Sequence, residues 1–390
     1  KPLYATENRL RNEIKRVGVD PYAEYLINKG LSFNIRIKNL RPCQANIIKQ
    51  EALAVGIDAA VARDVVSCSR DISDVCLFAH IHGLTKFVEK LKKQPFGLKD
   101  LALEIEDMLF ANKIRELKLR DVIMPLNKPK LMGILNTTPD SFSDGGLYTN
   151  REAILGRLIE FKEKGVDIVD IGGESTRPYS KRVSAEKEWS RIAFAVEKAL
   201  ELGLVVSVDT YKSEVAAEAL KLGVHMINDI SGMGFDKKMA EVVARYNSAI
   251  CLMHIKGVPE TMQDNPSYED VVEEIYFHLE DLINKAISAG ISKESIIVDP
   301  GFGFGKKLEH NLNLLKYFWE FSGLKVPLLV GISRKGFVGK LLGNQDKYRV
   351  LGSKLLEMLT LLQGASIIRA HDIDESKALI ELTNHLICDD

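Results

Sequence analysis

Several common features are scarce or missing in this sequence of 390 residues. It has only five cysteines and no Cys-x-x-Cys pair, which argues against a zinc ribbon or a disulfide framework. No apolar run approaches the roughly 20 residues that a membrane-spanning helix needs, and the first residues lack the apolar core of a signal peptide. These absences predict a cytoplasmic protein with reduced thiols and no membrane partner.

An excess of charge of one sign is also missing. The chain has 53 basic and 54 acidic side chains, which gives a formal net charge of −1. A protein without a basic excess lacks the counterion release that drives general binding to nucleic acids. Residues 1–128 have a small basic excess and the remainder an acidic one, so the two parts are treated separately. We expect no nucleic-acid partner for either part.

A connector that contains Pro125 and Pro129 divides the sequence. Two prolines so close together break a helix and stiffen the chain. We therefore predict a smaller α+β domain of unknown role in residues 1–124 and a second domain in residues 125–390. In the first domain the patterns predict strands at 32–37 and 75–81 and helices at 44–55, 85–92 and 98–120.

After the connector, short apolar runs alternate with longer amphipathic stretches. The runs predict strands at 130–134, 167–171, 204–208, 225–228, 249–253, 295–298, 327–330 and 365–369. The stretches between and after them predict helices at 151–164, 185–202, 213–222, 237–246, 268–289, 309–318, 347–362 and 374–387. Continuously apolar strands that are separated by helices indicate a parallel sheet buried on both faces. Eight such units predict a (β/α)8 barrel.

Polar residues and glycines follow every predicted strand of the barrel. In this fold the chemistry is located at the carboxyl ends of the strands. A single acidic residue there is more often a helix N-cap than a functional group. Capping does not explain arginine, lysine and histidine at the same end of the barrel, so we interpret these residues as a site.

Three kinds of chemical group can be distinguished at the strand ends. Asp209, Asn228 and Asp299 offer hydrogen-bond acceptors for a planar heterocycle that is rich in N–H groups. The cationic or potentially cationic side chains of Arg177, Arg369 and His371 suit an anion such as phosphate. Asn136, Asp140 and Asp144 follow the first strand and have the oxygen ligands that Mg²⁺ prefers. The Ser and Gly content of segment 136–146 is typical of a mobile lid, although a solvated loop is the alternative.

These motifs resemble the dihydropteroate synthases, the pterin-binding barrel family of folate synthesis. The resemblance extends from about Lys130 to Asp372 and is strongest in 132–146, 170–178, 299–306 and 333–335. It implies a transferase, the target of sulfonamides, in which para-aminobenzoate displaces diphosphate from 6-hydroxymethyl-7,8-dihydropterin diphosphate by Mg²⁺-assisted dissociative substitution. It also implies a homodimer.

The resemblance further implies a role for each site residue. The pterin would be held by Asp209, Asn228, Asp299 and Lys335, and the diphosphate with Mg²⁺ by Asn136, Arg369 and His371. The aminobenzoate would lie near Phe142, Thr176, Arg177, Pro178 and Gly336, of which Gly336 stands where many family members have Ser. Catalysis would rest on Asn136, Lys335, Arg369 and a protonated His371, which can stabilise the departing diphosphate.

Two alternatives to a synthase stay open. Pterin-binding methyltransferases share the barrel and the residues that match Asp209, Asn228 and Asp299, but they are not expected to have segment 136–146 or the Arg369-x-His371 pair. A non-catalytic barrel that serves as a scaffold is the second alternative. The complete set of charged residues at the strand ends argues against such a loss of function.

Overall fold

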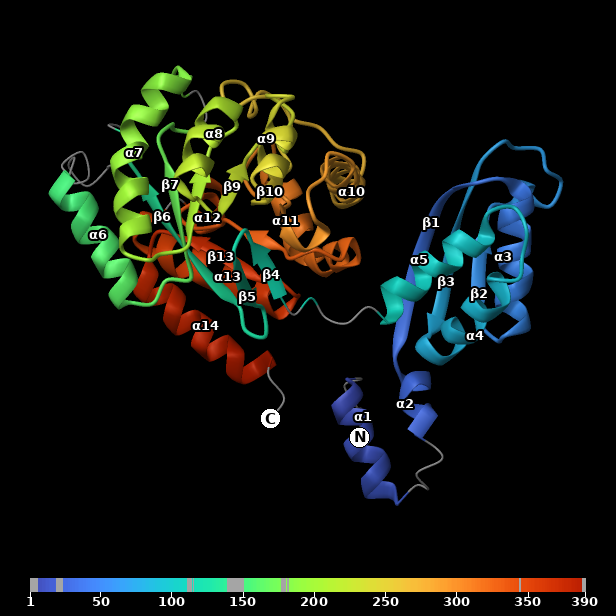
Figure 1. Cartoon of the computed structure of the whole chain (residues 1–390). Helices are drawn as coiled ribbons and strands as arrows, with labels where there is room; N and C mark the ends of the chain where they lie inside the picture. The colour runs from blue at the N-terminus through green and yellow to red at the C-terminus, as the bar shows by residue number, and fades with distance from the viewer. Residues whose placement is uncertain are drawn as a thin grey trace. The chain divides into compact units, whose positions relative to one another are not determined.

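The chain folds into two compact units, residues Lys1–Asn112 and Lys113–Asp390 (Figure 1). The computed structural model describes residues 6–18, 24–110, 114, 116–138, 151–176, 180, 182–343 and 345–387. The division lies closer to the N-terminus than the predicted one at 124/125, because segment 113–124 belongs with the second unit. No helix among the described residues is long and apolar enough to cross a membrane.

The front unit is built on a three-stranded antiparallel sheet in the order β1-β3-β2. Its strands are β1 (Ser32–Leu40), β2 (Asp58–Val61) and β3 (Ser73–His80), and its helices are α1 (Glu7–Val17), α2 (Tyr25–Gly30), α3 (Pro42–Ala54), α4 (Ile81–Leu91) and α5 (Leu98–Phe110). Ile37, Leu77 and Phe87 lie in a core that the sheet shares with α3, α4 and α5. The two predicted strands and the first two predicted helices are confirmed, whereas β2, α1 and α2 were not anticipated.

The second unit is a barrel of eight parallel strands in the order β11-β10-β9-β8-β7-β6-β13-β12. The strands are β6 (Lys130–Asn136), β7 (Ile168–Gly172), β8 (Val206–Asp209), β9 (Met226–Asp229), β10 (Ala249–Met253), β11 (Ile296–Asp299), β12 (Leu329–Val330) and β13 (Ile367–Ala370). A single bridge between Val298 and Leu328 closes the barrel, supported by a 3.0 Å hydrogen bond from the Val298 N–H to the Pro327 carbonyl. All eight predicted strands are confirmed.

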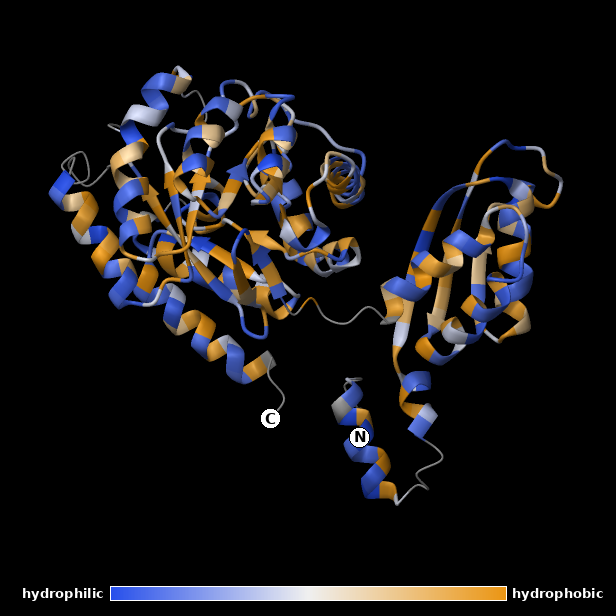
Figure 2. Ribbon diagram, viewed as in Figure 1, coloured by the Kyte–Doolittle hydropathy of each residue, from blue (hydrophilic) through white to orange (hydrophobic). Residues whose placement is uncertain are grey.

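Helices surround the barrel on the outside, and the strands within are predominantly hydrophobic (Figure 2). They are α6 (Arg151–Glu163), α7 (Ala185–Glu201), α8 (Ser213–Leu222), α9 (Met239–Arg245), α10 (Val271–Ser288), α11 (Leu308–Lys316), α12 (Gly336–Leu341), α13 (Arg349–Leu362) and α14 (Ile373–Ile387). Side chains of Ser184 and Asp270 cap the first turns of α7 and α10. Every helix predicted for the barrel is present, and α12 is an addition.

A β-hairpin covers the amino-terminal end of the barrel. Its strands are β4 (Glu116–Leu119) and β5 (Val122–Pro125), and its side chains Leu117, Leu119 and Met124 pack against Met132 and Ile168 of the barrel strands. The predicted helix over 98–120 is therefore wrong at Glu116–Leu119, which form β4, whereas α5 confirms it over Leu98–Phe110. Leu117 and Leu119 alternate with polar residues, and burial of both on the barrel favours a strand over a helix.

Candidate active site

The barrel brings the predicted site residues to one end, where the strands finish. Asn136 ends β6, Asp209 ends β8, and Asp299 ends β11. Asp209 is paired in register with Asn228 of β9 and with Gly172 of β7. A Cβ atom at Gly172 would lie 3.2 Å from Asn136 Oδ1 and 3.8 Å from Asp209 Oδ2, so both polar groups lie close to this glycine.

Arg369, on β13, lies at the centre of this arrangement. Its Nε is 2.6 Å from Asp170 Oδ2, and its Nη2 is 2.6 Å from Asp209 Oδ2. Asn228 Nδ2 donates to the same Asp170 oxygen at 3.0 Å, which leaves the Asn228 carbonyl oxygen as the acceptor. Arg369, assigned from the sequence to the diphosphate, therefore bonds directly to Asp209, which was assigned to the pterin.

Asp170 is a member of this hydrogen-bonded group that the sequence interpretation missed. It is fully buried on β7, and its Oδ1 has no hydrogen-bond partner among the described residues. The signal for it is an ionisable residue inside the apolar run Ile168–Gly172. It was overlooked because it does not stand at the end of its strand, where functional residues were sought.

Burial shifts the pKa values of Asp209, Asp299 and Lys335. It raises the pKa of Asp209 to about 7, although the charge of Arg369 opposes the rise. Burial also raises the pKa of Asp299, against a hydrogen bond from Gly301 and the charge of Lys335. Burial and Arg369 together lower the pKa of Lys335 to about 8. The site thus holds several groups whose protonation a ligand can change near neutral pH.

Lys335 is placed by the turn that precedes α12. It is the N-cap residue of that helix, and its Nζ lies 3.8 Å from the centre of the Phe304 ring. Asp299 Oδ1 accepts a 2.7 Å hydrogen bond from the Gly301 N–H. The backbone of Gly301 therefore orients Asp299, and the ring of Phe304 supports Lys335. Both Asp299 and Lys335 are pterin-binding candidates.

His371 follows β13 and is held by Ser333. Its Nδ1 lies 3.2 Å from Ser333 Oγ, and its own backbone N–H donates to the same oxygen. Burial together with the charges of Arg369 and Arg334 lowers the pKa of His371 to about 3. This lowered pKa favours a neutral imidazole before a ligand binds, whereas the sequence interpretation assigned a protonated His371 to the reaction.

The segment that follows β7 begins in a buried charge network. Lys212 Nζ bonds to the carboxylates of both Glu174 and Glu188, and Tyr211 donates its hydroxyl proton to Glu174. Glu174 also accepts a hydrogen bond from the Val183 N–H at 3.1 Å, which ties the two ends of the loop together. This network was not anticipated from the sequence.

Part of the predicted aminobenzoate site can be located. Thr176 lies in the described part of the same loop. Phe142, Arg177 and Pro178 lie outside the described residues, as do Asp140 and Asp144. Gly336 is the first residue of α12, and a Cβ atom there would meet no heavy atom within 4 Å. A larger side chain at that position would therefore fit.

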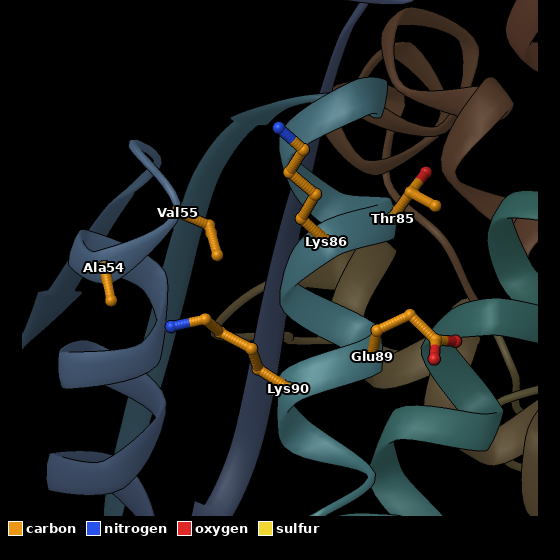
Figure 3. A pocket seen from close by; sticks show the side chains of 6 residues that line it. All are labelled: Ala54, Val55, Thr85, Lys86, Glu89 and Lys90. Atoms are coloured by element: carbon orange, nitrogen blue, oxygen red, sulfur yellow. The ribbon is translucent and has the colours of Figure 1, made fainter.

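Neither a metal cluster nor a second catalytic centre emerges from the described part of the chain. No three His, Cys, Asp or Glu side chains among the described residues could jointly hold a metal ion. The front unit has a pocket of about 490 Å³ between the end of α3 and helix α4 (Figure 3). It is lined by Ala54, Val55, Thr85, Lys86, Glu89 and Lys90. Lys90 pairs with Glu51, and Glu89 with Lys92, so two of its charged groups have partners.

Comparisons with known proteins agree with this picture of the barrel. The family described as pterin binding enzyme matches residues 132–371. Dihydropteroate synthase of Escherichia coli (strain K12) is 43% identical over 254 residues, which cover 65% of this chain and 90% of the relative. The bifunctional dihydropteroate synthase/dihydropteroate reductase of Helicobacter pylori is 34% identical over 382 residues, or 97% of this chain and 96% of the relative.

A solved structure shows the same fold. The crystal structure of dihydropteroate synthase from Thermus thermophilus in complex with 4-aminobenzoate is 41% identical, has a TM-score of 0.62, and covers 70% of this chain and 100% of that chain. The same enzyme was also solved in complex with 6HMPPP.

Proposed function

Because the chain belongs to the pterin-binding enzyme family, as a dihydropteroate synthase and thus a transferase of folate biosynthesis, we propose how its barrel performs the reaction. The aminobenzoate nitrogen forms a bond to the exocyclic carbon of 6-hydroxymethyl-7,8-dihydropterin diphosphate, the carbon–oxygen bond to diphosphate breaks, and the nitrogen loses a proton. The observation that carries this assignment is the convergence of Asp209, Asn228 and Arg369 on one another and on Asp170.

The pterin is recognised by acceptors that face its N–H groups. Asp209 ends β8 and Asp299 ends β11, with β9 and β10 between them in the sheet. The amide of Asn228, on β9, is oriented by Asp170 so that its oxygen can accept. Lys335, resting on the Phe304 ring, offers its ammonium to a ring acceptor. The two carboxylates also favour positive charge on the pterin as diphosphate leaves, because the site is buried and charges interact strongly there.

The diphosphate is recognised by Arg369 and His371 at the end of β13. Arg369 already bonds to two carboxylates, so diphosphate must share its guanidinium protons or displace a carboxylate. His371 is neutral before binding and can donate one N–H, and the negative charge of diphosphate would raise its pKa. Both groups therefore stabilise the charge that grows on the leaving group.

Asn136 fits a role as the protein ligand of Mg²⁺. It offers an amide oxygen at the end of β6 beside Asp209, and Mg²⁺ commonly takes only one or two protein oxygens together with waters and substrate phosphates. When bound, the ion would neutralise charge on the diphosphate oxygens. Thr176, Arg177, Pro178, Phe142 and the backbone at Gly336 are proposed to surround the aminobenzoate.

Product analysis is the direct test of this function. The protein is mixed with Mg²⁺, the pterin diphosphate and para-aminobenzoate, and dihydropteroate and diphosphate are both quantified. Equal amounts of the two products are expected, with none when the Asp209→Asn variant replaces the natural chain. Absence of both products from the mixture with the natural chain would contradict the synthase reaction.

We also propose a homodimer formed through α13 and α14. These helices are linked by a hydrogen bond between Lys354 and Ser376, and both expose leucines at helical spacing. The exposed leucines are Leu351, Leu355, Leu359, Leu362, Leu382 and Leu386. A contiguous apolar patch of this kind is typical of a protein interface. Sedimentation should show a dimer that Leu355→Lys dissociates, whereas Leu222→Lys, an exposed leucine on α8, should leave it intact.

Reduction of dihydropteroate is a second candidate function. It is favoured by the Helicobacter pylori relative, which aligns with the front unit as well as with the barrel and is named as both a synthase and a reductase. The reaction needs a hydride and a proton, which we assign to a reduced nicotinamide and to solvent. Incubation of the full chain with dihydropteroate and NADH or NADPH should yield tetrahydropteroate. A chain that begins at residue 113 should not form it.

A cytoplasmic location stays a prediction.

A further inference from the structure

Lys306 is a buried lysine that directly follows segment 301–305 and precedes α11. Its side chain is among the buried charged groups, and none of the ion pairs between described residues involves it. Its Nζ lies 2.7 Å from the Gly301 carbonyl oxygen, 3.0 Å from the Phe304 carbonyl oxygen and 3.0 Å from His254 Nδ1. The His254 carbonyl oxygen is a fourth, longer contact at 3.4 Å. The three shorter contacts match the three protons of an ammonium group.

The segment around Lys306 is the one that supports the pterin-binding candidates. The N–H of Gly301 orients Asp299, and the ring of Phe304 lies beneath the Lys335 ammonium. The same two residues, Gly301 and Phe304, give their carbonyl oxygens to Lys306. A single buried cation therefore holds the backbone of Gly301, which orients Asp299, and the backbone of Phe304, which supports Lys335.

Uncharged contacts hold the segment as well. Gln263 Nε2 donates to the Gly303 carbonyl oxygen at 2.6 Å, and the Tyr268 hydroxyl donates to the Gly305 carbonyl oxygen at 2.8 Å. These two side chains anchor the same loop without placing a charge near Asp299. They provide the matched controls for a charge effect.

The ionisable groups around Asp299 and Lys306 define the electrostatics. Asp299 is faced by Lys335, Lys306 and Arg369, whose charges each lower its pKa, while burial raises it. Burial lowers the pKa of Lys306 well below its usual range, and the charge of Asp299 opposes this. Burial, Lys306 and His278 lower the pKa of His254, which favours a neutral ring whose Nδ1 can accept a hydrogen bond from Lys306.

We propose that Lys306 is a positioning residue of the synthase reaction: its buried ammonium holds segment 301–305 beneath Lys335 and supplies positive charge that keeps Asp299 ionised for the pterin. The inference rests on the proposed function, because it requires Asp299 to bind the pterin as a carboxylate. Lys306 acts through Asp299 and Lys335 and does not itself touch the ligand.

The test follows the pH dependence of pterin binding. The full chain and its variants are titrated with 6-hydroxymethylpterin, which lacks diphosphate, between mildly acidic and neutral pH. Loss of the Lys306 charge should raise the pKa of Asp299, so the acid limb of binding in Lys306→Met should move to higher pH by about one unit. Tyr268→Phe and Gln263→Ala should weaken binding without moving the limb.

Two further variants keep the inference falsifiable. If Lys306→Met does not fold, Lys306→Gln should show the same shift, and Lys306→Arg, which keeps the charge, should show the natural limb. An unmoved limb in the neutral variants, or an equal shift in Tyr268→Phe, overturns the role of Lys306. Asp299→Asn separates the two levels: if it retains full pterin affinity, the proposed function of the site fails, whereas its loss with an unmoved Lys306 limb refutes only this inference.

Discussion

The two ends of the barrel differ in the polarity of their buried side chains. At the carboxyl ends of the strands, Asp209, Asp299 and Arg369 are charged or chargeable groups taken largely out of water. At the amino ends, Leu117 and Leu119 of the β4–β5 hairpin cover an apolar surface of the strands. Burial of charge costs free energy, and burial of apolar area returns it. The apolar contacts at the hairpin end therefore stabilise a barrel whose opposite end holds the buried charged groups of the candidate site.

Removal of the hairpin should have the largest effect on the stability of the barrel. A chain that begins at residue 127 lacks it, whereas a chain that begins at residue 113 lacks only the front unit. Loss of three buried apolar side chains should cost the shorter chain at least about 4 kcal/mol of unfolding free energy. Both should keep measurable synthase activity at low temperature, because every proposed site residue lies after Lys130.

Thermal unfolding and activity of the two shortened chains provide the measurement. Leu117→Ala in the full chain is the intermediate case, with a loss of about 2–4 kcal/mol. Equal melting temperatures for the two shortened chains would show that the hairpin does not stabilise the barrel. A folded but inactive chain from residue 113 would show that the front unit supplies groups to the synthase site.

A substitution at the carboxyl ends of the strands should weaken ligand binding and leave stability almost unchanged. Asp299→Asn should weaken pterin binding by about 2–4 kcal/mol, because an amide presents N–H groups to N–H groups. Stability should hardly fall, since burial already disfavours the carboxylate. Calorimetry with 6-hydroxymethylpterin and thermal unfolding give the two quantities. Unchanged pterin affinity would remove Asp299 from the site.

The site end can itself be divided by substrate. His371→Ala and Arg369→Ala should lower turnover about 10- to 100-fold through lost stabilisation of the leaving group. His371→Ala should bind a pterin without diphosphate almost normally, and Arg369→Ala less so, because it leaves Asp170 and Asp209 without their cation. Turnover and pterin affinity are measured on the same preparations. If both variants lose pterin affinity in proportion to turnover, the diphosphate assignment is wrong.

The smallest effect is a proton released on binding. The pKa of Asp209 is raised from 3.8 to about 7, so the folded chain retains this proton between about pH 4 and 7 while the unfolded chain has lost it. The contribution of Asp209 to stability therefore falls as pH rises through that window. Pterin N–H groups favour the carboxylate, so binding near pH 6.5 should release a fraction of a proton. Calorimetry in buffers of different ionisation enthalpy measures it, and Asp209→Asn should abolish it.

The sequence predicted the carboxyl end of the barrel better than the rest. Apolar runs marked all eight strands, and the residues after them gathered at one end of the barrel as a candidate site, because both signals depend on neighbours in the chain. The hairpin was missed although Leu117 and Leu119 alternate, since the run is too short to show its period beside the helix before it. Its strand form depends on burial against Met132 and Ile168, which the local sequence does not contain.

The contacts that organise the site were equally invisible. Asp170 stands inside its strand, and its bond to Arg369 joins residues at the two ends of the barrel sequence. Lys306 was taken only as the end of a glycine-rich motif, because its three acceptors are brought together by the turn at Gly301 and by His254 from another strand. Such pairings follow from tertiary packing and not from spacing along the chain.

The closure of the barrel has a consequence for its motions. Between β11 and β12 there is one bridge, at Val298 and Leu328, and β12 itself has only two residues. Local opening is cheapest where the fewest backbone hydrogen bonds must break. Amide hydrogens along this seam should therefore exchange with solvent sooner than those of β7 or β8. Asp299 ends β11 on one side of the seam, and Lys335 follows β12 on the other side. A pterin bound to both would therefore link the two strands and slow this opening.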